Sequence, residues 1–237
     1  MQAGLWLSLA SSVQTDRASD GFSAGNDDAS TAAQHTNAYL WRHIIKLCAE
    51  LRARRIVDIG CGNGALCCEL ASHGYEVIGC EPNADDLRVA RNRAPELVFH
   101  KLGVDDDPSA LGTETFDLAI AVEVIEHLVR PVSLPDFAKQ LLRPGGHLII
   151  STPYHGYLKN LVLALTNKWD AHLNPFWDGG HIKFWSRRTL SQLLNDNGFR
   201  VVRFIGAGRL PFMWKSMIVV AQKPQASEQL ITRDSPG

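Results

Sequence analysis

Apolar residues recur along this chain in two alternating patterns. Short, nearly continuous apolar runs are typical of strands, whereas apolar positions three or four residues apart are typical of helices. The run Phe116–Val122 has the composition of a strand that is buried on both faces of a sheet. The apolar runs predict strands at residues 55–59, 75–80, 97–101, 116–122, 147–151, 200–205 and 216–221. The periodic segments predict helices at residues 36–54, 65–73, 84–94, 135–142 and 187–197.

This order of elements predicts a single α/β domain. Strands that alternate with helices through residue 151 imply right-handed crossovers, and therefore a mostly parallel, seven-stranded sheet with helices on both faces. No helix is predicted between the last two strands, so we expect the last strand to be antiparallel. The domain is expected to span residues 32–224, between a flexible N-terminal extension at 1–31 and a disordered tail at 225–237. The irregular segment 152–185 is interpreted as a lid insertion, because loops of this length are usually functional.

A glycine-rich turn follows the first predicted strand. It reads Val57-Asp58-Ile59-Gly60-Cys61-Gly62-Asn63-Gly64 and leads directly into a helix. Glycines allow the backbone to bend sharply and to approach a ligand, and the amide groups at a helix N-terminus face that ligand. Dinucleotide-binding enzymes use a similar turn, usually as G-x-G-x-x-G. Here the third glycine comes one residue early, and the carboxylate of Asp58 suits a cationic ligand better than a pyrophosphate. Glu81 ends the second strand, where an acidic side chain can bind ribose hydroxyls.

Four motifs together resemble the class I S-adenosylmethionine (SAM)-dependent methyltransferases. They are D-I-G-C-G-N-G, V-I-G-C-E-P-N, F-D-L-A-I-A-V-E-V-I-E-H-L and L-L-R-P-G-G-H-L-I-I-S-T-P, and the resemblance covers roughly residues 36 to 222. It implies a Rossmann-like fold, with the glycines around the amino-acid end of SAM, Glu81 on the ribose and the adenine near Gly103. The cofactor-binding residues expected on this basis are Asp58, Gly60, Gly62, Gly64, Glu81, Val104, Asp105 and Val122.

A second cluster of polar residues follows the fourth predicted strand. Glu123, Glu126 and His127 begin at the carboxyl end of that strand, the edge at which open parallel sheets bind ligands. If a helical turn starts there, their spacing places all three side chains on one face. Two carboxylates and an imidazole make a plausible site for a divalent cation, and His181 is a fourth candidate ligand. Glu126 and His127 are also the candidate catalytic residues.

The E-x-x-E-H motif with a later H-x-x-F segment resembles two groups of O-methyltransferases. One group is the ubiquinone-biosynthesis O-methyltransferases, which methylate catechol-like phenols. The other is the small-RNA 3′-terminal 2′-O-methyltransferases, whose Mg²⁺ or Mn²⁺ ligands are two Glu and two His in this pattern. The resemblance implies SAM as cofactor and Mg²⁺ or Mn²⁺ as an optional one. Two alternatives stay open for His127: a general base without metal, or a hydrogen-bonded structural residue.

Composition narrows the choice of acceptor and of partners. The net charge of −1 and the few cations in 152–185 disfavour nucleic acid, because a phosphate backbone requires several cations. The five cysteines show no C-x-x-C spacing, so we expect reduced thiols in a cytoplasmic protein. The apolar run at residues 161–165 would pack in the core, cover an apolar acceptor or contact a membrane surface peripherally.

The sequence therefore predicts a SAM-dependent methyltransferase that O-methylates a small hydroxylated acceptor, catechol-like or quinol-like, with optional metal assistance. One alternative is an N- or C-methyltransferase that needs no metal. Another, of a different class, is a dinucleotide-dependent oxidoreductase. The oligomeric state is left open by the sequence.

Overall fold

A computed structural model describes residues 27–169, 173 and 180–225 of the chain. Its centre is a seven-stranded sheet in the order β3-β2-β1-β4-β5-β7-β6. Neighbouring strands are parallel except for β7, which is antiparallel to both β5 and β6. The predicted fold class is therefore confirmed. The strands are β1 (Arg55–Ile59), β2 (Glu76–Cys80), β3 (Val98–His100), β4 (Phe116–Val122), β5 (Leu142–Pro153), β6 (Arg200–Ala207) and β7 (Ser216–Gln222).

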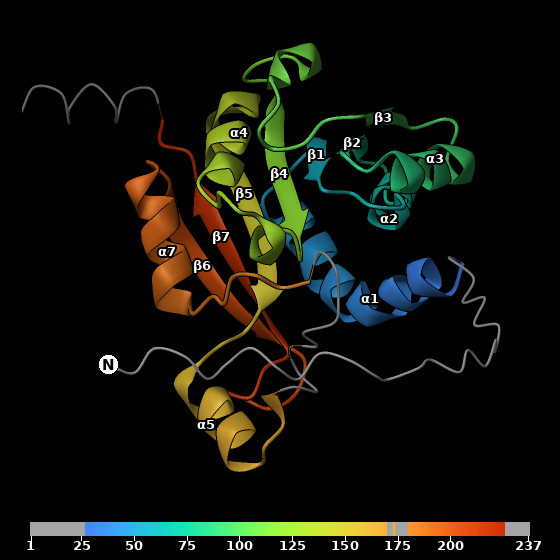
Figure 1. The fold of residues 1–237 in the computed structure, drawn as a ribbon. Coiled ribbons are helices and arrows are strands. Elements are labelled where there is room, and N and C mark those ends of the chain that lie inside the picture. Colours follow the sequence, from blue (N-terminus) through green and yellow to red (C-terminus); the bar gives the residue numbers. More distant parts are fainter. Residues whose placement is uncertain (1–26, 170–172, 174–179, 226–237) are drawn as a thin grey trace, which may run out of the picture.

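Helices cover both faces of the sheet (Figure 1). The helices α1, α2 and α3 pack on one face through residues such as Leu40, Leu70 and Leu87. The helices α4 and α7 pack on the other face through residues such as Phe137 and Leu190. The helices are α1 (Asp27–Glu50), α2 (Ala65–Ser72), α3 (Ala84–Arg93), α4 (Ser133–Leu141), α5 (Tyr157–Leu165) and α7 (Arg187–Asp196), with short 3-10 turns η1 (Pro108–Leu111) and η2 (Ile125–His127). Figure 1 shows α5 beyond the carboxyl end of β5, away from both layers.

Local capping explains where several helices begin and end. The side chain of Asn83 accepts hydrogen bonds from the backbone N–H groups of Asp85 and Asp86, as an N-cap residue does. Ser186 and Thr189 form a capping box at the start of α7. Gly198, which follows α7, has a φ of +78°, a conformation that glycine adopts at little cost. These starts and stops agree with the sequence pattern.

Two elements differ from their predicted bounds by more than two residues. Helix α1 begins at Asp27 rather than at Thr36, so residues 27–31 of the predicted extension are helical. Alanines and an acidic start favour a helix there, which the spacing of large apolar residues does not reveal. Strand β5 begins at Leu142 and includes the predicted Pro-Gly-Gly turn, with an irregular register opposite Phe116. The rest of the extension, 1–26, and residues 226–237 of the predicted tail lie outside the described residues.

The sheet topology creates one edge suited to ligand binding. Strand β1 pairs with β2 on one side and with β4 on the other, so the chain order reverses between β1 and β4. In open α/β sheets, ligands bind at the carboxyl ends of the strands at such a switch point. The glycine-rich turn follows β1 and Glu123 follows β4, and both therefore lie at this edge. Within the described part of the chain, no helix is long and apolar enough to span a membrane.

Candidate functional site

The glycine-rich turn bends through left-handed backbone at three positions. Gly60, Gly62 and Gly64 have φ values of +72°, +52° and +74°. A Cβ atom on Gly60 would lie 2.6 Å from Cγ2 of Val124, so this glycine packs closely against the chain that leaves β4. A Cβ atom on Gly62 would meet no atom within 4 Å among the described residues. Gly62 therefore presents its backbone to open space, as a ligand-binding turn requires.

Glu81 connects this turn to the next helix. It directly follows β2 and is 8% exposed. One carboxylate oxygen accepts a hydrogen bond from the N–H of Gly62 at 2.9 Å, and the other accepts one from the N–H of Asn83 at 2.8 Å. Burial raises the pKa of Glu81. Each carboxylate oxygen can accept a second hydrogen bond, so the group can still bind hydroxyls.

Asp58 is a buried residue of β1, just before the glycine-rich turn. Its side chain is 2% exposed and accepts a hydrogen bond from the thiol of Cys67 on α2 at 3.3 Å. Burial raises the pKa of Asp58 to about 7. Direct contact between this carboxylate and a cofactor stays a prediction.

The predicted adenine-binding loop is held by α4. The carboxylate of Asp105 accepts a hydrogen bond from the hydroxyl of Ser133, the first residue of α4, at 2.5 Å. Arg130 lies 3.9 Å from the same carboxylate oxygen. Val104 is partly buried against the core beside this loop, and Val122 is partly buried at the end of β4. The carboxyl ends of β1, β2, β3 and β4 therefore all contribute candidate cofactor residues to one edge of the sheet.

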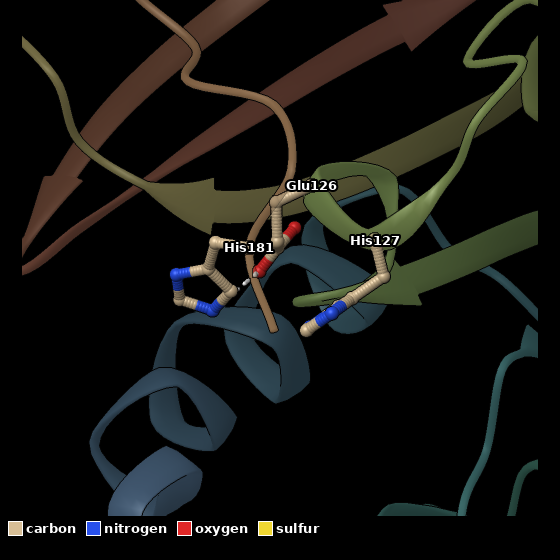
Figure 2. A group of neighbouring side chains, drawn as sticks. All are labelled: Glu126, His127 and His181. Atoms are coloured by element: carbon tan, nitrogen blue, oxygen red, sulfur yellow. Dashed lines mark ion pairs between the residues drawn. The ribbon is translucent and has the colours of Figure 1, made fainter. Parts of the chain in front are cut away.

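The polar residues after β4 form a smaller group than the sequence predicts. Ligand atoms of Glu126, His127 and His181 lie within 4.8 Å of one another. Figure 2 shows these three side chains converging, with His181 coming from a segment far along the chain. Glu123, the remaining residue of the four predicted ligands, is not part of this group. Its φ is +56°, so the helical spacing assumed for Glu123, Glu126 and His127 is wrong, and only Ile125–His127 form a 3-10 turn.

Backbone hydrogen bonds hold the two segments of this group together. The carbonyl of Glu126 accepts hydrogen bonds from the N–H groups of Ile182 at 2.9 Å and Lys183 at 3.0 Å. The Nδ1 atom of His127 lies 3.2 Å from the carbonyl oxygen of Gly180. A carbonyl can only accept, so Nδ1 is the donor in this contact, which orients the imidazole ring.

Glu126 is the electrostatic centre of the group. It is 1% exposed, and neither carboxylate oxygen has a hydrogen-bond partner among the described residues. Nε2 of His181 lies 3.9 Å from one of these oxygens. Burial, reinforced by the charge of Glu123, raises the pKa of Glu126 well above its ordinary value. A buried carboxylate that accepts no hydrogen bond is costly, so Glu126 is a candidate to bind a cation or a hydrogen-bond donor.

Sequence reasoning missed the residues that surround Glu123. Its carboxylate accepts hydrogen bonds from the hydroxyls of Ser151 at 2.9 Å and Ser216 at 3.2 Å, and Ser216 in turn accepts one from Tyr39. A signal was present in the topology. Ser151 lies near the end of β5 and Ser216 begins the antiparallel β7, so the two serines must lie at the same edge of the sheet.

Three leucines of α5 are exposed. Leu158, Leu161 and Leu165 are 45%, 39% and 77% exposed, so core packing of this helix is excluded for these residues. Lys159 of the same helix is buried instead. It is 2% exposed, and its Nζ lies 3.4 Å from the carbonyl oxygen of Lys215. The interpretations as a cover for an apolar acceptor or as a membrane-contacting segment remain.

Comparison with known proteins identifies similar chains. The family described as "Methyltransferase domain" matches residues 33–203. The ubiquinone biosynthesis O-methyltransferase of Aromatoleum aromaticum is 27% identical over 167 residues, which cover 69% of this chain and 71% of that protein. The mitochondrial ubiquinone biosynthesis O-methyltransferase of Homo sapiens is 29% identical over 168 residues, which cover 68% of this chain and 46% of that protein.

Solved structures share the fold. A SAM-dependent methyltransferase from Thermotoga maritima superposes with a TM-score of 0.60 and 21% identity, over 84% of this chain and 95% of that one. Among the curated relatives, the matched part spans between 45% and 71% of the relative's own length. The similarity to ubiquinone biosynthesis O-methyltransferases is therefore confirmed, and it covers only part of their length.

Proposed function

The chain belongs to the methyltransferase-domain family and is a SAM-dependent methyltransferase, and from this premise we propose that it methylates an oxygen of a small catechol-like or quinol-like acceptor. The observation that supports oxygen as the methylated atom is the buried carboxylate of Glu126, which accepts no hydrogen bond from the described residues and lies beside His127 and His181. Such a group suits an acceptor that must lose a proton as it reacts.

The residues around the glycine-rich turn fit SAM. The open space in front of Gly62 leaves room for a ligand that approaches the backbone closely, and a side chain there would fill it. Glu81 lies next to Gly62 with acceptor capacity for the ribose hydroxyls. When bound, SAM supplies an electrophilic methyl group. The chain's own contribution is to orient it toward the edge at which β4 ends, because methyl transfer requires the two reacting atoms in line.

The residues of the acceptor side fit both a divalent cation and a vicinal diol. The group offers one carboxylate and two imidazoles, from Glu126, His127 and His181. The carboxylate suits both Mg²⁺ and Mn²⁺, and Mn²⁺ accepts imidazole ligands more readily than Mg²⁺ does. A cation held there would lower the pKa of a hydroxyl that binds to it. The contact of His127 Nδ1 with the carbonyl oxygen of Gly180 orients the ring, and this orientation supports a role for His127 in accepting the acceptor's proton.

The lid and the domain bounds belong to the same proposal. We assign residues 32–224 to the catalytic domain and residues 152–185 to its lid insertion. The outward leucines of α5 favour an apolar acceptor that the lid covers. The ubiquinone biosynthesis relatives support this choice, since a quinone precursor is hydroxylated and apolar. The net charge of −1 argues against RNA as acceptor.

The competing function is an N- or C-methyltransferase that uses the same cofactor residues without a metal. The family match favours either methyltransferase over the dinucleotide-dependent oxidoreductase. A chelator separates the two methyltransferases, because an amine or carbon acceptor needs no help from a cation in this group.

The test is a methyl-transfer assay with radiolabelled SAM and 4-alkyl catechols of increasing chain length. We expect O-methylated product, faster turnover with longer chains, and loss of activity in EDTA that Mn²⁺ restores. Glu126→Gln should lower kcat at least about 100-fold, whereas Glu76→Gln, a matched change at an exposed ion pair with Arg55, should not. Full activity in EDTA with unchanged turnover in Glu126→Gln would rule out the metal-assisted mechanism.

A further inference from the structure

The backbone of Glu123 is held in an unfavourable conformation by its own side chain and by its neighbours. A φ of +56° lies in the left-handed region, which is unfavourable for a non-glycine residue. The N–H of Glu123 donates to both the carbonyl and the hydroxyl oxygens of Ser151, each at 3.1 Å. The Ser151 hydroxyl in turn donates to the Glu123 carboxylate at 2.9 Å. These contacts fix the turn from which Glu126 and His127 project three and four residues later.

A second set of hydrogen bonds leads from Glu123 to helix α1. The buried hydroxyl of Ser216 donates to the Glu123 carboxylate at 3.2 Å, and it accepts the Tyr39 O–H at 2.6 Å. The Ser216 hydroxyl has one proton to donate, so while it donates to the Glu123 carboxylate it can only accept from Tyr39. Burial raises the pKa of Tyr39 to about 12, so the phenol remains a donor in neutral solution.

Tyr39 is itself tightly placed. A Cβ atom added to Gly208 would lie 3.4 Å from its ring, and Nζ of Lys215 lies 4.9 Å from the ring centroid. The neighbouring Leu40 is fully buried against the sheet. The position of α1 is therefore connected, through Tyr39 and Ser216, to the turn that follows β4.

We propose that Tyr39, Ser216 and Glu123 are positioning residues of the methyl-transfer site, which couple the docking of α1 to the geometry of Glu126 and His127. This role rests on the proposed function only in its effect on turnover. The coupling itself can be measured on the protein with S-adenosylhomocysteine alone. Glu123 thus acts through its backbone turn, which accounts for its absence from the group of Glu126, His127 and His181.

The test is amide hydrogen exchange of the full chain with saturating S-adenosylhomocysteine. Tyr39→Phe removes one hydrogen bond at α1, and we expect exchange of residues 123–128 to rise about three- to tenfold. Ser216→Ala should give a similar rise, and adding Tyr39→Phe to Ser216→Ala should give no further change in that segment. Tyr75→Phe is the matched control, because Tyr75 directly precedes β2 and so lies at the amino ends of the strands, away from the carboxyl ends that carry the site.

Two results would overturn the proposal. One is faster exchange confined to α1 in Tyr39→Phe, with residues 123–128 unchanged. The other is an equal effect of Tyr75→Phe. With an active acceptor, Tyr39→Phe should lower kcat while the KM for SAM stays unchanged. If the wild-type chain methylates no catechol, the proposed acceptor class fails, whereas the exchange experiment still decides the coupling.

Discussion

Replacing Asp58 by Asn should make the protein more stable, by an amount that depends on pH. The carboxylate is 2% exposed, and among the described residues its only hydrogen-bond donor is the weak thiol of Cys67. Burial raises its pKa from the ordinary value of 3.8 to about 7. Since one pKa unit corresponds to about 1.4 kcal/mol, keeping this carboxylate ionised in the folded state costs about 4 kcal/mol.

The sign follows from proton binding in the two states. Between pH 3.8 and about 7 the folded protein holds a proton on Asp58 that the unfolded chain has released. The free energy of unfolding therefore falls as pH rises through this window and stays low above it. Asn does not titrate, so the stability advantage of Asp58→Asn over wild type should widen by about 2–3 kcal/mol between pH 5 and pH 8.

Urea denaturation of both proteins at several pH values measures this advantage. Asp117→Asn is a control with the opposite sign. Burial alone would raise the pKa of Asp117. Hydrogen bonds from the backbone N–H groups of Arg55 and Arg54 and from the side chain of Arg143 outweigh burial and lower this pKa. Asp117→Asn should therefore destabilise the protein. A stability difference for Asp58→Asn that does not change between pH 5 and pH 8 would refute this reasoning.

Two further changes have defined outcomes. Gly62→Val should weaken S-adenosylhomocysteine binding at least about 100-fold in calorimetry, because a side chain would fill the open space before the turn. The control is Gly112→Val. Gly112 has a φ of +86° and lies away from the site, so this change imposes similar strain and should leave binding unchanged. Lys159→Met should stabilise the protein by up to about 3 kcal/mol at pH 7, because burial lowers the lysine pKa from 10.5 to about 8. The unfolded chain binds more protons between pH 8 and 10.5, so wild type gains stability there and the difference should shrink to about 1 kcal/mol by pH 10. A difference that is as large at pH 10 as at pH 7 in chemical denaturation would contradict this.

The sequence pattern predicts most of the fold because the relevant signals are local. Apolar runs such as Phe116–Val122 and caps such as Asn83 and Ser186 act within a few residues, and the structure confirms each. The start of α1 at Asp27 was missed because alanine and acidic residues favour a helix without a large apolar face.

The site could be predicted only in part, because its geometry depends on contacts between distant segments. The glycine-rich turn and Glu81 are adjacent as the motifs imply. The spacing of Glu123, Glu126 and His127 suggested a shared helical face, but the left-handed backbone at Glu123 cannot be read from a spacing. That conformation is maintained by Ser151, far along the chain, and the hydrogen bonds from Glu123 through Ser216 to Tyr39 are likewise long-range.

The most direct test of this account is calorimetric titration of the wild-type chain and of Glu81→Gln with S-adenosylhomocysteine. The glycine-rich turn and Glu81 should give saturable binding of one ligand per chain, with no comparable heat for NAD. Loss of the charged acceptor should weaken binding at least about tenfold. The absence of saturable heat with wild type, or equal affinity in Glu81→Gln, would contradict the proposed cofactor site.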